Sequence, residues 1–140
     1  MGAWSHEAFG NDDALDWVHG LEEVDDLSLI EAAVDAVNDE AEGYLESPQA
    51  TEALAAIELI ARLRGHAAPD EALPEVAEDW IARTRLVPPE PLVQRALAAL
   101  DRIAGDDSEL KELWDESDSA EDWAASLASL RERLLAPPVA

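Results

Sequence analysis

Apolar residues recur along most of the chain at intervals of three and four, the spacing that places them on one face of an α-helix. The pattern is interrupted only by glycines, prolines and short polar stretches. It predicts an all-α fold, a single compact domain of about six to seven antiparallel helices over residues 1–140. Only Thr84 to Val87 is faintly strand-like, and that stretch is too short to form a sheet.

Residues that favour helix ends mark the limits of the predicted helices. These helices are expected to start near Asn11, Asp26, Ser47, Glu71 or Pro74, Pro91, Asp107 or Ser108, and Ser119. Ser47 with Pro48 combines a favoured cap with a proline at the first helical position, and Ser119 with Asp122 resembles a capping box. The proline-rich stretch 86–91 predicts a rigid elbow within the domain.

Aromatic residues fall into two groups. Four tryptophans lie on predicted apolar helix faces and are expected in the core. They are Trp17, Trp80, Trp114 and Trp123. Trp4 lies outside a helix, and with Phe9 it is expected to fold back over the first helix; an exposed aromatic binding spot is the alternative. Tyr44, near the end of the second helix, is expected in the core or at its rim.

Charge is distributed very unevenly. The chain has 33 acidic and 9 basic residues, a net charge of −24, and its first 61 residues hold 16 acids with no lysine or arginine. Such a field repels nucleic acid and anionic lipid and attracts basic partners. Solubility, or adaptation of composition to a salty or GC-rich lineage, would produce the same acidity. Direct nucleic-acid binding is not expected.

Several kinds of chemistry lack a motif. The chain has no cysteine, which excludes disulfides and thiolate metal sites. Apolar runs are too short to span a bilayer, and the N-terminus lacks the basic region of a signal peptide, so we expect a cytoplasmic protein that does not bind membranes. No nucleotide-binding or nucleophile motif occurs, and we expect no cofactor and no catalytic residue.

The acids offer two candidate metal patterns. Asp12, Asp13 and Asp16 form a D-D-x-x-D string, the spacing that holds magnesium and diphosphate in prenyl-diphosphate synthases. No cation is nearby to hold a diphosphate, and a helix cap followed by acids in the first turn explains the string better. The pairs Glu75/Glu78 and Glu109/Glu112 resemble those of all-helical nucleotide pyrophosphatases, but so acidic a chain contains such pairs by chance.

One N-terminal group remains as a candidate binding site. His6 and Glu7 could form a small polar site beside Asn11 and Asp12, although an ordinary surface loop is the simpler interpretation. The candidate binding residues are therefore Trp4, His6, Glu7, Asn11, Asp12 and Asp16. We predict no metal ligands.

The same N-terminal segment carries a family resemblance. Its matching residues are Gly2, Trp4, Phe9, Asn11, Asp12, Ala14, Asp16 and Trp17. In these positions the chain resembles the bacterial family called domain of unknown function 4259, whose members often have glycine where this chain has Ser5. The stretch from Gly105 to Trp114, and Trp123, are also similar. The resemblance implies a small, acidic, mostly helical bacterial protein and implies no reaction.

Two functions from different classes follow. The favoured one is a non-enzymatic protein-interaction module that binds a basic partner through its first three helices, as an immunity protein, an antitoxin or a mimic of nucleic-acid charge. The alternative is a divalent-metal-dependent enzyme or small-ligand-binding module that uses the N-terminal acidic segment.

Overall fold

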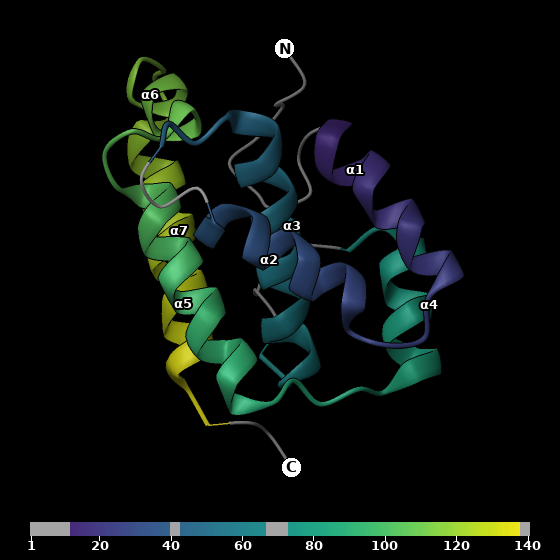
Figure 1. Cartoon of the computed structure of the whole chain (residues 1–140). Helices are drawn as coiled ribbons and strands as arrows, with labels where there is room; N and C mark the ends of the chain where they lie inside the picture. Colours follow the sequence, from purple (N-terminus) through teal and green to yellow (C-terminus); the bar gives the residue numbers. More distant parts are fainter. Residues whose placement is uncertain (1–11, 40–42, 67–72, 138–140) are drawn as a thin grey trace.

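The computed structural model describes residues 12–39, 43–66 and 73–137, and over these residues the chain is helical (Figure 1). The elements are α1 (Asp12–Val18), the 3-10 helix η1 (His19–Glu23), α2 (Ser28–Asp39), α3 (Ser47–Leu63), α4 (Glu75–Thr84), α5 (Glu90–Ala104), α6 (Glu109–Asp115) and α7 (Ala120–Leu135). The predicted all-α fold of six to seven helices is confirmed. The extent of the domain, residues 1–140, stays a prediction.

Helix α3 runs through the middle of the molecule, with α1, α2, α5 and α7 packed around it (Figure 1). Every residue from Ala53 to Ala61 is buried. A helix that is apolar on all faces belongs inside a protein, whereas a surface helix buries one stripe. The sequence predicted a stripe, so the burial of the other faces of α3 is a finding of the structure.

The predicted tryptophan core is confirmed in part. Trp80 and Trp123 are buried, with 1% and 4% of their surfaces exposed. Trp17 and Trp114 are only half-buried. Trp114 stacks on Trp123, with ring centroids 6.3 Å apart and planes 6° from parallel, so this pair joins α6 to α7.

One predicted helix cap, Ser47, is wrong, and a second, Ser119, is the N-cap residue of α7 but lacks the predicted side-chain bond. Ser47 is the first residue of α3, and its N–H donates to the Glu109 carboxylate at 2.7 Å, so the cap of α3 comes from α6. The Ser119 side chain accepts no capping hydrogen bond, and the capping box does not form. Ser108 does cap α6, because its Oγ accepts from the N–H of Lys111 at 3.4 Å.

The apolar positions Ala14, Trp17, Val18 and Leu21 predict a first helix that continues through Leu21, and the observed helix is shorter. It ends at Val18, and Leu21 enters the core from the tighter turn of η1. Helix α4 packs mainly on η1. The Trp80 indole N–H donates to the Val24 carbonyl at 3.0 Å, and Arg83 pairs with Asp25. These contacts attach α4 to the segment that follows α1.

The connection between α4 and α5 overlaps the stretch 86–91, where a rigid elbow was predicted, and the elbow itself stays a prediction. Residues 85–89 are not helical, Arg85 has a left-handed backbone with φ of 49°, and Pro88 is buried. Helix α5 already begins at Glu90, with Pro91 in its first turn. Among the described helices, none is both long and apolar enough to cross a membrane.

A buried ion-pair cluster joins α3 to α7. Glu58 is 1% exposed, and both of its carboxylate oxygens accept hydrogen bonds from Arg133, at 2.7 and 2.8 Å. Arg62, one turn later on α3, donates to the same carboxylate at 2.8 Å. A charge buried in this way must be paired, since an uncompensated one strongly favours the unfolded chain.

Glu58→Gln is expected to lower the free energy of unfolding by about 3–5 kcal/mol, because two largely buried arginines lose their counter-charge. Urea denaturation of the full chain measures this loss. An unchanged denaturation midpoint would show that the cluster does not hold α7 on α3.

Candidate functional site

The predicted N-terminal site is covered only in part by the structure. Trp4, His6, Glu7 and Asn11 lie outside the described residues. Asp12 and Asp16 lie one turn apart on α1, and both are exposed. Their role in binding therefore stays a prediction.

The structure adds no support for a metal centre. The described residues contain no group of three or more histidine, aspartate or glutamate side chains placed to hold a metal ion. Asp12 and Asp13 are the acids of the first turn of α1, where the helix dipole favours negative charge.

Acidic residues gather on one part of the surface, which we call the acidic lobe. It consists of residues 12–26 (α1, η1 and the turn after them) and residues 73–85 (α4 and its ends). Its carboxylates are Asp12, Asp13, Asp16, Glu22, Glu23, Asp25, Asp26, Glu75, Glu78 and Asp79, and all ten are exposed. Arg83 and Arg85 are the only lysine or arginine residues in these two ranges. Because α1 and α4 both pack on η1, the charges share one region (Figure 1).

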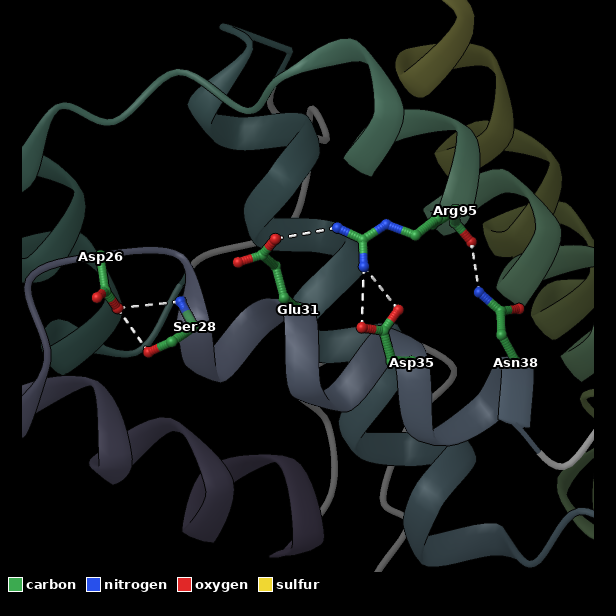
Figure 2. A network of polar contacts seen from close by, with 6 residues as sticks. All are labelled: Asp26, Ser28, Glu31, Asp35, Asn38 and Arg95. Carbon is green, nitrogen blue, oxygen red and sulfur yellow. Dashed lines mark hydrogen bonds and ion pairs between the residues drawn. The ribbon is translucent and has the colours of Figure 1, made fainter.

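The acids of α2 serve a different purpose. Arg95 reaches from α5 and forks between two of them (Figure 2). It donates to Asp35 at 2.8 and 2.9 Å and to Glu31 at 3.0 Å. The Asn38 amide also donates to the Arg95 carbonyl, at 3.1 Å. These contacts bind α2 to α5, so the charges of Glu31 and Asp35 are satisfied within the molecule.

Asp26 lies two residues before α2 and stabilises the start of that helix through hydrogen bonds with Ser28. Its Oδ1 accepts from the Ser28 hydroxyl and from the Ser28 N–H at 3.0 Å (Figure 2). These bonds favour the charged carboxylate, so they hold the pKa of Asp26 below its usual value. Asp26 therefore orders the start of α2 while remaining exposed on the lobe.

One carboxylate beside the lobe is disfavoured in its charged form. Glu52 lies on α3 near Asp13 of α1, and burial together with the charge of Asp13 raises the pKa of Glu52. Among the described residues, no lysine or arginine forms an ion pair with Glu52 to offset this effect. The packing of α1 on α3 thus brings two like charges together.

The pair Glu109/Glu112 is used within the fold. Glu109 caps α3 through Ser47, as described above, and Glu112 accepts a hydrogen bond from the Tyr44 hydroxyl. That bond, followed by burial and nearby negative charge, raises the pKa of Tyr44 to about 12. A pyrophosphatase-like use of this pair finds no support in its contacts.

A largely apolar groove lies between α5, α6 and α7. It encloses about 390 Å³ and is lined chiefly by leucine, alanine and Trp123. Two ion pairs flank it, Asp101 with Arg131 and Lys111 with Asp115. Since each rim charge already has a partner, no polar group is left to orient a ligand in the groove.

The described residues form a helical protein with exposed carboxylates gathered over α1, η1 and α4. Residues 2–126 match the family described as a domain of unknown function, DUF4259, and the chain belongs to this family. The resemblance carried by the N-terminal motif is thereby confirmed. No curated protein and no solved structure matches the chain.

Sequence reasoning missed the contacts of two residues. Glu58 stands in an alanine-rich helix with an arginine four residues later, and a lone glutamate in so apolar a segment could have indicated a buried ion pair. Tyr44 was assigned to the core or its rim, but it is 48% exposed and bound to Glu112. No local pattern indicates a partner that lies 68 residues away.

Glu112→Gln is expected to lower the pKa of Tyr44 from about 12 toward its ordinary value of 10, because the variant removes the charge that favours the neutral phenol. Tyr44 is the only tyrosine in the chain, so near-ultraviolet absorbance of the phenolate reports its titration directly. An unchanged titration curve would contradict the contact.

Glu52→Gln is expected to raise the free energy of unfolding at pH 7. The pKa of Glu52 is higher in the folded chain than in the unfolded chain, so ionisation destabilises the fold as the pH rises through that range. The advantage of the variant should disappear well below pH 4.5, where wild-type Glu52 is protonated in both states. Denaturation at several pH values checks this, and a less stable variant at pH 7 would contradict it. Glu58→Gln, the same change on the same helix, should act in the opposite direction.

Proposed function

We propose that the protein is a non-enzymatic, cytoplasmic interaction module that binds a basic protein partner through its acidic lobe. The observation that supports this most directly is the exposure of all ten carboxylates of the lobe beside only two arginines. A complementary basic surface gains speed of association and specificity from such a field. An immunity protein, an antitoxin or a mimic of nucleic-acid charge would use a surface of this kind.

The contacts of the other acids narrow the surface that we assign to the partner. Glu31 and Asp35 are held by Arg95, and Glu58 is buried against Arg133. Charges paired within the molecule contribute little to the attraction of a partner. The proposed surface is therefore α1, η1 and α4, rather than the first three helices. The same field disfavours direct binding to nucleic acid.

The test is a titration of the full chain with a short arginine-rich peptide, measured by calorimetry at increasing NaCl. The Kd should rise with salt, because the range of exposed charges falls from about 30 Å at 0.01 M to about 8 Å at 0.15 M. The double variant Asp12→Asn, Asp16→Asn should weaken binding by roughly threefold or more.

A matched double variant, Glu121→Gln with Glu132→Gln, removes two exposed charges from α7 and leaves the lobe intact. It should change the Kd much less. Binding that does not depend on salt, or that both double variants weaken equally, would contradict the assignment to the lobe.

A further inference from the structure

A second surface feature combines exposed apolar side chains with negative charge. Tyr44 and Leu113 are 48% and 36% exposed, and they are two of the four large hydrophobic residues that are exposed among the described residues. Both line one hollow of about 470 Å³. The rest of its lining is Glu109, Glu112, Asp115 and Glu116. Two apolar residues and four carboxylates therefore line the same hollow.

The wall formed by Tyr44 is held in place by the backbone. The Leu45 N–H donates to the Asp107 carbonyl at 2.8 Å, and the Glu109 N–H donates to the Leu45 carbonyl at 2.9 Å. This pairing is a single parallel β-bridge between the segment before α3 and the start of α6. With the hydroxyl of Tyr44 bound to Glu112, the aromatic ring is positioned against α6 without any ligand.

The charges at this end of α6 contradict the usual preference of a helix. Asp115 is its last residue and Glu116 its C-cap, where the helix dipole favours cations, and its last turn contains no basic residue, whereas Glu112 belongs to its first turn. Lys111 pairs with Asp115 at 2.6 Å. Glu112 and Glu116 have no ion pair with a cation among the described residues. Glu116 is thus an acid at a helix C-cap with no evident structural gain, and a residue that breaks a local rule in this way indicates a functional position.

We propose that this hollow is the anchoring site for one arginine side chain of the basic protein partner, an assignment that rests on the proposed function. The guanidinium would stack on the ring of Tyr44 and fork onto Glu112 or Glu116. Arginine fits better than lysine, because its planar group stacks on aromatic faces and binds carboxylates with two hydrogen bonds. Its apolar stem would cover Leu113. The acidic lobe would attract the partner at long range, and the hollow would hold one arginine of the partner in a defined position.

The test uses three forms of one short basic peptide, in which a central arginine is kept, replaced by lysine, or replaced by citrulline, the neutral analogue of arginine. Calorimetry with the full chain at constant ionic strength gives each Kd. The arginine form should bind best. Tyr44→Leu and Glu116→Gln should each weaken its binding roughly tenfold, and neither should weaken the citrulline form.

Glu132→Gln is the matched control, since it removes one exposed charge from α7 at a distance from the hollow and should change the Kd less than twofold. Circular dichroism checks that each variant is folded. If Tyr44→Leu unfolds, the test of the hollow rests on Glu116→Gln, which changes an exposed residue outside the core.

If Glu116→Gln changes the Kd no more than Glu132→Gln does, while the wild type still binds with salt dependence, the assignment of the hollow is wrong and the proposed function stands. If the wild type binds none of the peptides at low salt, both are wrong. Equal binding of the arginine and lysine forms would overturn the choice of arginine.

Discussion

The burial of α3 on every side is the constraint on which the rest of the structure depends. Four helices have to cover it, and each contributes an apolar face to do so. The one carboxylate in its buried middle, Glu58, must be neutralised where it lies, and Arg133 can reach it only if α7 packs alongside. The hydrophobic effect thus selects the arrangement of helices, and the ion pair acts together with the buried apolar stripe of α7 to fix which face of that helix turns inward.

The uneven charge of the sequence is partly resolved by the fold. Arginines from the second half of the chain reach back to acids of the first half, as Arg95 does for α2 and Arg83 does for Asp25. Electrostatic attraction between the halves therefore contributes to cohesion as well as to surface potential. Part of what remains after this pairing lies on the acidic lobe, where the fold brings the exposed carboxylates of α1, η1 and α4 together.

Periodicity predicted the existence and order of the helices, because each buries an apolar face that local sequence encodes. It did not predict the cap of α3, since Glu109 supplies it from 62 residues away. It also extended the first helix through Leu21, because a 3-10 turn keeps that residue on nearly the same face. The aspartates of α1 were visible as candidates from the sequence, whereas the hollow at Tyr44 exists only after tertiary pairing of Leu45 with the start of α6.

Helix α4 is weakly attached to the rest of the fold and also carries part of the charge of the acidic lobe. It buries only Ala77 and Trp80, and much of its hold on the molecule is one indole hydrogen bond and the contacts of Arg83. Elements with so little buried surface open at a lower free energy than the core around them. Helix α4 also carries three exposed carboxylates of the acidic lobe. A ligand that binds the lobe more tightly when α4 is packed on η1 than when it is detached would shift α4 toward the packed state. The arrangement of charges on the lobe would then depend on the bound ligand, while the helices around α3 stay in place.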